Sequence, residues 1–372
     1  GELQIPLLNE ANSGLHSFIV SVSGRYDSYS DFGDTFNPKV GASLMPFEWF
    51  TIRGNWGTSF TAPTPLDQLG SLTNQISAFP FVAFTRPGDT PLPGSRTVAV
   101  QGSVPNLQPQ TADTWSVGFD ASPPVVKGLR ASLAYYSVNF ENILGTPTPN
   151  VGIFTDFPGN VTTNVAGLSA AQLTAFAALA PNGLSVINPL IASSAIVYQT
   201  VDFRTGNFGV LRVKGLDFSA NYSLPIGVGS LDASVSGNYQ LSRKQQASPT
   251  AAVADLLLFD NPKLFLQSTL GLTIDAFRAS ATLNHTGGFA IRPTTGVPVQ
   301  NRVGSFNTVN LFLGYDLAAK SGLLQDVSLT VNVNNVFDTD PPLLFRNDQG
   351  DAGYANGFTI GRMFIFGVSK KF

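Results

Sequence analysis

The chain has 372 residues, of which 12% are charged and 11% aromatic, and its net charge is −3 at neutral pH. Soluble globular domains carry about 25% charged residues, so this chain is poor in charge. Its 21 lysines and arginines are too few and too scattered for a nucleic-acid-binding surface. The absence of cysteine excludes disulfides and thiolate chemistry. The low charge and many aromatic residues instead predict strands with one apolar and one polar face.

Alternation of apolar and polar residues recurs along the whole chain. In FTIRGNWGTSF (50–60), Ile52 and Trp56 alternate with Arg53 and Asn55, a period typical of strands. Many of these segments exceed the five or six residues usual in soluble sheets. No apolar run is long enough for a transmembrane helix. Thirteen strands are predicted, at 1–8, 15–29, 37–46, 49–60, 112–122, 129–143, 208–223, 231–243, 262–274, 276–289, 303–317, 327–338 and 358–372.

The connections between the predicted strands alternate between short and long. Short ones include 122–128 and 225–230. An antiparallel sheet with short turns at one end and long loops at the other is typical of outer-membrane barrels, whose long loops are extracellular. A soluble sandwich or propeller is the alternative, but such long strands with a uniformly apolar face suit lipid better. The predicted extracellular loops are 61–111, 144–207, 243–261, 290–302 and 339–357.

The number of predicted strands is odd, and an odd number cannot close an entirely antiparallel sheet. We therefore expect residues 1–372 to form part of a larger barrel and to begin at or inside an extracellular loop. The last strand should pair on one side with 327–338 and on the other with a strand from outside this sequence. Pairing of the last strand with 1–8 would instead indicate a small closed barrel.

Four stretches resemble TonB-dependent outer-membrane receptors. FNPKVGASLMPFEWFTIRGNWGTSFTAPTPLDQLG (36–70) is similar to the strand, turn and loop entry of that family, with Thr61 where arginine is usual. NLQPQTADTWSVGFDASPPVVKGLRASLAYYSVNFENIL (106–144) resembles a following hairpin. VNVNNVFDTDPP (331–342) and GRMFIFGVSKKF (361–372) resemble the last two strands. The resemblance extends over the whole chain.

The resemblance implies an all-β, transmembrane antiparallel β-barrel of about 22 strands with an internal plug, of which this chain would supply about 13 C-terminal strands. It implies a bacterial outer-membrane location and active import of a scarce nutrient, such as a siderophore, cobalamin, glycan or peptide. The implied partners are outer-membrane lipid and lipopolysaccharide, and the TonB energy-coupling complex, which would act through the plug. The plug and first strands would lie in preceding sequence or in a second chain. A passive porin and a structural barrel subunit are the alternatives.

Polar residues in the predicted strands are expected to line the lumen. An arginine on the lipid face costs about 2–4 kcal/mol at mid-membrane, so Arg53 and Arg278, each in mid-strand, should point inward. Their expected role is hydrogen bonding to the plug or to interior water. The predicted lumen-lining residues are Arg53, Asn55, Arg130, Arg278 and Asn284.

The long loops are the best candidates for ligand binding. The segment AFPFVAFTRPGDTPLPGSR (78–96) mixes aromatic and cationic side chains that could hold an apolar or anionic ligand, although loop aromatics often pack against their own loop. GLSAAQLTAFAALAPNG (167–183) predicts a short helix with Ser169 as N-cap and Gly183 near its end. The candidate ligand-binding residues are Phe79, Phe81, Phe84, Arg86 and Arg96.

Two further groups of residues are assigned structural roles. Aromatic residues near strand ends, including Trp115 and Tyr135, are predicted to lie at the membrane interfaces. The final strand carries a barrel-closing signature of alternating apolar residues: Phe364, Phe366, Val368 and Phe372.

The sequence offers no catalytic or metal-binding constellation. The two histidines, His16 and His285, are far apart in the predicted barrel, whereas a metal site or catalytic triad needs converging groups. We therefore expect neither an enzyme nor a resident cofactor.

Overall fold

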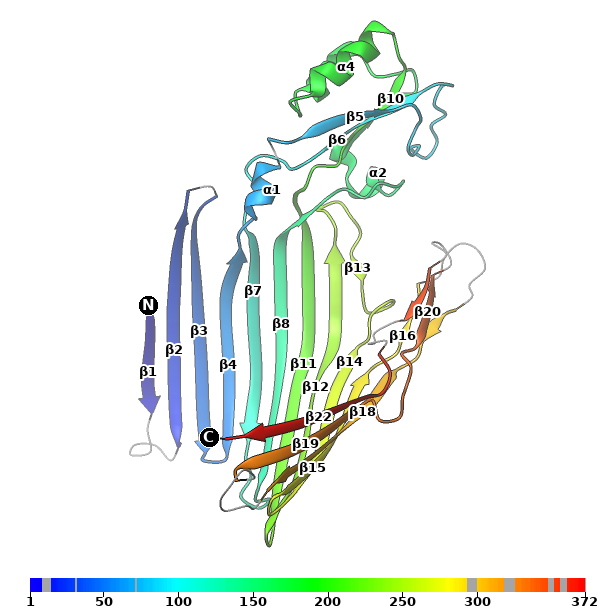
Figure 1. Ribbon diagram of the computed structural model, residues 1–372. Helices are drawn as coiled ribbons and strands as arrows, with labels where there is room; N and C mark the ends of the chain where they lie inside the picture. The colour runs from blue at the N-terminus through cyan, green and yellow to red at the C-terminus, as the bar shows by residue number, and fades with distance from the viewer. Residues whose placement is uncertain are drawn as a thin grey trace.

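A computed structural model describes residues 1–8, 15–30, 32–70, 72–292, 300–317, 325–346, 351–354 and 360–371. The largest element is an antiparallel sheet whose thirteen principal strands are ordered as they occur in the chain (Figure 1). These strands are β1 (Glu2–Leu8), β2 (Ser17–Tyr29), β3 (Gly33–Phe47), β4 (Phe50–Thr61), β7 (Gln110–Ala121), β8 (Leu129–Gly145), β11 (Gly206–Ile226), β12 (Gly229–Gln246), β14 (Leu264–Ile274), β15 (Phe277–Thr286), β18 (Phe306–Asp316), β19 (Val327–Asn334) and β22 (Met363–Lys370).

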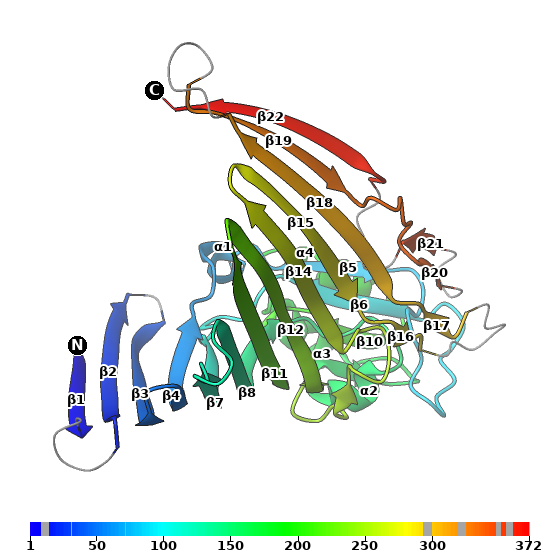
Figure 2. The same cartoon turned by 90° about the horizontal axis from the view of Figure 1, so that it is seen from below.

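The sheet is curved and open, as the view from below shows (Figure 2). β22 pairs with β19 from Lys370 to Met363, which confirms the predicted neighbour of the last strand. β1 pairs with β2, and within the described ranges no ladder joins β1 to β22. The small closed barrel is therefore not formed, and the predicted partial barrel is confirmed.

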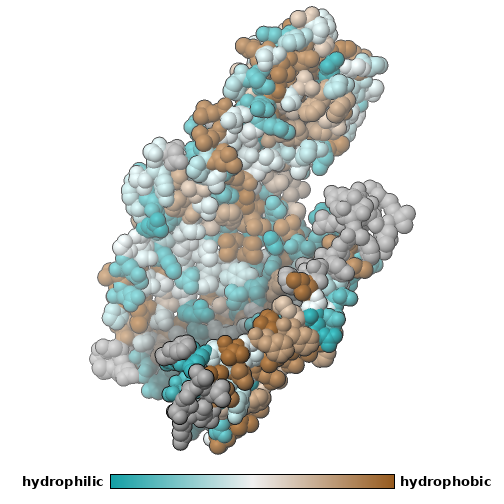
Figure 3. Space-filling model, viewed as in Figure 1, coloured by the Kyte–Doolittle hydropathy of each residue, from teal (hydrophilic) through white to brown (hydrophobic). Residues whose placement is uncertain are grey.

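The two faces of the sheet differ in polarity. On one face, Ile52 lies opposite Phe119, and Leu133 lies opposite Phe218. On the other face, Arg53 binds Asp120 and Ser132. The hollow that faces the viewer in Figure 3 is coloured mainly white to teal, with a brown area near its middle, whereas brown, hydrophobic residues cover much of the near rim. The concave face is therefore the polar one, as expected for the inside of a barrel.

The short connections are tight turns that depend on unusual backbone conformations. Gly128, which precedes β8, has φ +88°, and a Cβ atom there would lie 2.0 Å from the carbonyl oxygen of Ser223. Gly227 between β11 and β12 has φ +54°, and Asp275 between β14 and β15 has φ +46°. Glycine and aspartate tolerate this left-handed region better than most residues, so the hairpins reverse within a few residues.

A second folded unit lies beyond the ends of β7, β8 and β11 in Figure 1. It is built from the two longest connections and will be called the cap (residues 62–109 and 146–205). The two connections meet in one four-stranded sheet in which β6 and β10 form a parallel central pair. Its elements are α1 (Pro65–Leu69), β5 (Gln75–Phe79), β6 (Arg96–Gln101), α2 (Ile153–Asp156), η1 (Pro158–Asn160), β9 (Val161–Thr163), α3 (Ala170–Ala177), α4 (Gly183–Ala192) and β10 (Val197–Asp202).

The helix predicted within 167–183 is present as α3. The Ser169 side chain accepts a hydrogen bond from the backbone N–H of Gln172, whose side chain accepts one from the backbone N–H of Ser169. This reciprocal capping box confirms the predicted start. The prediction for Gly183 was wrong, because Gly183 begins α4 rather than lying at the end of the first helix.

The remaining long connections carry short strand pairs. β13 (Ala254–Asp255) pairs with β12. β16 (Phe289–Ala290) pairs with β17 (Arg302–Val303), and β20 (Leu343–Arg346) pairs with β21 (Asp351–Tyr354). No helix within the described ranges is long and apolar enough to cross a membrane.

Candidate ligand-binding cap and polar face

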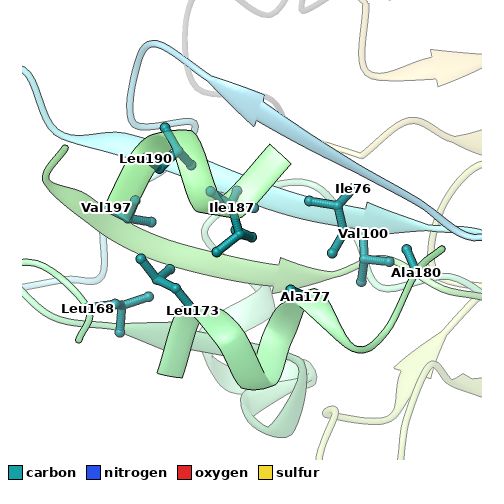
Figure 4. Packing of buried hydrophobic residues seen from close by; sticks show 10 residues of the cluster. Ile76, Val100, Leu168, Leu173, Ala177, Ala180, Ile187, Leu190 and Val197 are labelled. Atoms are coloured by element: carbon teal, nitrogen blue, oxygen red, sulfur yellow. The ribbon is translucent and has the colours of Figure 1, made fainter. Parts of the chain in front are cut away.

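The cap has a hydrophobic core of its own. Helices α3 and α4 pack against one face of its sheet (Figure 4), where Val98, Val100, Ile187 and Val197 are completely buried. A sheet containing a parallel pair is usually covered on both faces, and aromatic residues from both connections cover the other face. The two connections therefore fold together as one body and not as independent loops.

Two asparagine side chains join the connections through backbone groups. The Asn182 side chain accepts from the N–H of Ile76 at 2.9 Å and donates to the carbonyl of Ile76 at 3.0 Å. Asn74 donates to the carbonyl of Leu179 at 3.0 Å and accepts from the N–H of Ser103. Each asparagine thus replaces backbone pairing between segments about 100 residues apart in the sequence.

We expect Asn182→Ala to destabilise the cap by about 1–3 kcal/mol, because the N–H and carbonyl of Ile76 lose their partner in a partly buried place. Hydrogen exchange of residues 75–79 should accelerate while exchange in β11 stays unchanged. Asn150→Ala is a control, because among the described residues the Asn150 side chain accepts only from Gly152, two residues away. Equal acceleration of hydrogen exchange in both variants would contradict the proposed role of Asn182 in joining the two connections.

The candidate ligand-binding residues divide between the interior and the surface of the cap. Phe79 and Phe84 pack against the aromatic side of the core, where Phe84 contacts Phe154 at 5.9 Å between ring centroids. Phe81 is 55% exposed. Phe79 and Phe84 are therefore partly committed to packing, while Phe81 remains accessible.

The two candidate arginines also lie in different settings. The Arg86 guanidinium is exposed and lies 5.3 Å from the ring centroid of Phe154, an arrangement that stabilises a cation. Arg96 begins β6 and is half-buried, with its backbone N–H bonded to Ile196. Phe81 and Arg86 are consequently the members of the predicted set that present their side chains most openly.

Sequence reasoning missed the residues contributed by the second connection. Phe154 and Phe203 lie beside Phe84, and the Tyr198 hydroxyl accepts from the backbone N–H of Arg86. A pocket of about 310 Å³ is lined by residues of both connections, including Gln101 from the first and Phe203 from the second. The high aromatic content of both connections was the available signal, but it does not show which rings meet.

A buried tyrosine links the cap strands to the segment carrying Arg86. The Tyr198 hydroxyl donates to Asp89 at 2.7 Å and accepts from the backbone N–H of Arg86 at 3.1 Å. Burial, and then the hydrogen bond to Asp89, raise the pKa of Tyr198 above its ordinary value. The neutral phenol is therefore the form that stabilises this segment.

We expect the Tyr198 contribution to cap stability to be complete below the ordinary tyrosine pKa of about 10. This contribution should be lost as the pH rises through the raised pKa of Tyr198, because the folded cap disfavours the ionised hydroxyl. Tyr198→Phe should destabilise the cap by about 1–2 kcal/mol at neutral pH and weaken this alkaline dependence. Hydrogen exchange in residues 84–89, corrected for intrinsic rates, measures both effects. An unchanged alkaline profile in the variant would contradict the assignment.

The concave face holds a network of polar side chains that crosses several strands. Arg53 donates through Nε to Asp120 at 2.8 Å and through its terminal nitrogen to Ser132 at 3.1 Å. Asn55 donates to Ser116 at 2.9 Å. Polar groups on this face therefore satisfy one another across β4, β7 and β8.

The same face continues toward the C-terminal strands. Arg278 contacts both carboxylate oxygens of Asp316, at 2.8 and 3.0 Å, and Asp316 also accepts from Ser328. Asn284 accepts from Gln267 at 2.9 Å. Arg53 and Arg278 both lie on the polar face, but the prediction that Arg278 lies in mid-strand was wrong, because it is the second residue of β15.

Arg130 lies on this face opposite Asn221 in the neighbouring strand, near the short-turn end. It lines a pocket of about 370 Å³ together with Asp232. A larger concavity of about 960 Å³ near the other end is lined by Arg25 and Lys39, among others. The five predicted lumen-lining residues thus share one face; their role in a closed lumen stays a prediction.

The predicted barrel-closing residues lie on the opposite, apolar face. Phe364, Phe366 and Val368 are 58%, 75% and 74% exposed, and their cross-strand partners on β19 are valine and leucine. Phe372 lies outside the described residues. One edge of β22 is paired and its outward face is apolar, which are the properties expected of the strand at which a barrel closes.

His16 directly precedes β2, whereas His285 lies in β15 and forms a hydrogen bond with Asn307 at 2.6 Å. Within the part of the chain that the structure describes, no group of three or more histidine, aspartate or glutamate residues converges as metal ligands would.

Several solved structures are similar to this chain. A mutant of the ferric enterobactin receptor PfeA from Pseudomonas aeruginosa shares 18% identity with a TM-score of 0.57, covering 95% of this chain and 42% of that chain. The siderophore receptor PirA from Acinetobacter baumannii shares 15% identity (TM-score 0.57, coverage 98% and 44%). The outer membrane transporter YddB from Escherichia coli shares 13% (TM-score 0.59, coverage 96% and 43%).

These similarities establish the fold, and the chain spans less than half the length of each of these three proteins. No curated protein sequence matches the chain. The sequence profile described as "TonB dependent receptor-like, beta-barrel" matches residues 1–336, which include twelve of the thirteen principal strands. The open, curved sheet with its apolar outer and polar inner face agrees with that match, and the chain belongs to the TonB-dependent receptor β-barrel family.

Proposed function

We propose that this chain forms the C-terminal part of a plugged barrel that actively imports a scarce nutrient across the bacterial outer membrane. The observation that carries the proposal is the curved sheet, apolar outside and polar inside, in a chain of this family. Its two unpaired edges, on β1 and β22, would be completed by about nine further strands of a 22-stranded barrel. Those strands and the plug would come from preceding sequence or from a second chain.

We place the cap on the extracellular side, where it would make the first contact with substrate. The predicted extracellular loops all emerge at the same end of the sheet as the cap, because strand direction alternates. Successive connections also touch one another. Thr250 donates to the carbonyl of Asp156 at 2.7 Å, and Gln300 donates to the carbonyl of Leu343 at 2.9 Å. The connections would thus form a continuous rim around the entrance.

Within the predicted substrate classes of siderophore, cobalamin, glycan or peptide, the cap surface favours an anionic, aromatic siderophore. Phe81 is exposed, and Arg86 presents a guanidinium beside the ring of Phe154. Aromatic stacking and charge-assisted hydrogen bonding suit such a ligand. Of the three similar structures described above, one is a ferric enterobactin receptor and one is a siderophore receptor.

The proposed function would require two outside partners. An inner-membrane TonB complex would supply energy through the plug, and outer-membrane lipid, including lipopolysaccharide, would surround the apolar face. The polar residues of the concave face, including Arg53 and Arg278, would contact the plug or interior water.

Uptake measurements test the import proposal. Cells that express the complete receptor should accumulate a labelled ferric siderophore, and collapse of the proton gradient should abolish this accumulation. Uptake that persists without the gradient would indicate the alternative of a passive porin. Absence of uptake for all four substrate classes, with the barrel correctly assembled, would favour a structural subunit.

Phe81→Ala and Arg86→Ala together should weaken siderophore binding about tenfold or more.

A further inference from the structure

The ladder between β3 and β4 ends before either strand does. Its last pair toward the cap is Lys39 opposite Gly57. Beyond this pair, residues 33–38 of β3 pair only with β2, and residues 58–61 of β4 pair only with β7. Two strand edges therefore face each other at the cap end of the sheet without a ladder between them. We call the space between these two stretches the β3–β4 gap.

A proline explains why the ladder stops at this point. Pro38 pairs with Gly24 on β2, and the backbone N–H and carbonyl of Gly24 are both bonded to Gly1, on the side away from β3. By the alternation of an antiparallel ladder, the backbone polar groups at position 38 point toward β4. Proline has no N–H to donate there, so the bond that would continue the ladder to Thr58 cannot form.

Backbone groups further along both strands share this orientation. Phe36 lies two residues from Pro38, so its N–H and carbonyl also point toward β4, and those of Thr58 and Phe60 point toward β3. The two edges thus offer alternating donors and acceptors in the spacing that a strand requires. An extended peptide is the ligand class that matches such edges, because its own backbone carries the same alternation.

Buried polar side-chain atoms also line the gap. The hydroxyls of Thr35 and Thr58 and the amide nitrogen of Asn37 have almost no accessible surface, and within the described ranges they have no hydrogen-bond partner. All three residues line a pocket of about 490 Å³ on the outward side. Thr58 and Asn37 also line the concavity of about 960 Å³ on the polar side. Buried polar groups are normally hydrogen-bonded, so these atoms favour an occupant with polar groups of its own.

The two sides of the gap carry opposite charge. Asp34, Asp113 and Glu141 line the outward pocket, whereas Lys39 lines the concavity on the polar face. None of these four residues forms an ion pair in the part of the chain that the structure describes. Successive side chains of a strand point to opposite faces. A peptide with basic residues outward and an acidic residue inward would therefore match both sides.

The gap lies on the extracellular side of the aromatic boundary. Trp56 and Trp115 face each other on the outward face, and aromatic residues of this kind mark the edge of the hydrocarbon layer. Thr58 is two residues further along β4, and so about 7 Å nearer the cap. Gln108, at the base of the cap, lines the outward pocket. A peptide can therefore reach the gap from outside without crossing hydrocarbon.

We propose that the open edges of β3 and β4 bind an extended segment of a partner protein at the cell surface, which adds to them as a short strand. The segment presents lysine or arginine to Asp113 and Glu141 and an acidic side chain to Lys39. Its side chains pack against Phe60, which lies 6.0 Å from Tyr29 between ring centroids across the outer end of the gap. The inference goes beyond import and rests on the proposed function only for placing the gap outside the cell.

Peptide titration of the complete receptor in nonionic detergent, followed by fluorescence anisotropy, tests the proposal. The probe is a labelled, acetylated Lys-Val-Lys-Glu-Lys peptide, compared with the same peptide N-methylated at its lysine amides. The methylated peptide keeps every charge but loses backbone donors, so it should bind at least tenfold more weakly. Hydrogen exchange in residues 33–38 and 58–61 should slow when the unmethylated peptide binds.

The double variant Asp113→Asn, Glu141→Gln should raise the dissociation constant of the peptide about tenfold. The double variant Glu48→Gln, Asp275→Asn removes the same charge from exposed positions in the short turns at the other end of the sheet and should leave peptide binding unchanged. An equal loss of affinity in both double variants would overturn the proposed charge match.

Pro38→Thr supplies the missing backbone N–H. The ladder should then extend toward Thr58, close the gap and weaken peptide binding about tenfold or more. Unchanged binding in this variant, or equal binding of the methylated and unmethylated peptides, would overturn strand addition. Displacement of the peptide by an equal concentration of spermidine would assign the carboxylates to free polyamines instead. Siderophore uptake is measured separately, so its absence with intact peptide binding would reject only the proposed import.

Discussion

Leu270→Arg is expected to destabilise the assembled barrel by about 2–4 kcal/mol, the cost of a cation near the membrane midplane. Leu270 lies near the middle of β14 and is 63% exposed on the outward face. Its cross-strand partners are Ala233 and Ala281, which offer no polar group. Unfolding of the complete barrel in lipid vesicles by guanidinium chloride would measure the change.

Thr269→Arg provides the matched control, because Thr269 is adjacent in sequence but lies on the polar face. Its hydroxyl lies 2.9 Å from that of Thr282, so the substitution loses one hydrogen bond but places the charge in a polar environment. We expect a cost of about 1 kcal/mol. If Thr269→Arg were as costly as Leu270→Arg, the assignment of the outward face to lipid would be wrong.

Val100→Asp is expected to unfold the cap while the barrel remains intact. Val100 is completely buried in the cap core and lies in β6, the strand that joins β5 to β10. Burial of an unpaired carboxylate there should cost about 4 kcal/mol or more. Limited proteolysis should then cut within 62–109 and 146–205, and under the proposed function siderophore binding should be lost.

Gln101→Asp introduces the same side chain at the exposed neighbouring position of β6 and should leave the cap protected. The mobility of the unheated barrel on electrophoresis should be the same in both variants, because the main sheet does not depend on the cap core. Retention of protease resistance in Val100→Asp would contradict the description of the cap as one cooperative unit.

Alternation along single strands was enough to predict the main sheet and its faces. The pattern placed Arg53 and Arg278 on the polar side, and both are there, each bound to an aspartate on a neighbouring strand. The pattern is readable because side chains of a strand point to alternate faces, and a sheet between lipid and water needs opposite chemistry on those faces. Which aspartate each arginine binds depends on the register between neighbouring strands, and the alternation within one strand does not give that register.

The cap shows where local patterns fail. RTVAVQ in β6 and VYQTVD in β10 are almost completely buried on both faces, so neither shows the polar-apolar alternation that identified the barrel strands. They pair in parallel although they are about 100 residues apart in the sequence. Only Ser169, whose capping box is local, signalled one of the cap helices in advance.

The sequence by itself determined the strand class and the polarity of each face, because these follow from residues two positions apart, and the odd number of predicted strands indicated the incomplete sheet. Only the tertiary structure decided which candidate ligand residues remain accessible. Phe84 meets Phe154 and Phe203 from the other connection, whereas Phe81 stays 55% exposed. The tertiary structure likewise brings Arg212 and Lys244 side by side, through the ladder between β11 and β12. Contacts between distant segments depend on how the chain folds back, and the residue types alone do not encode those distances.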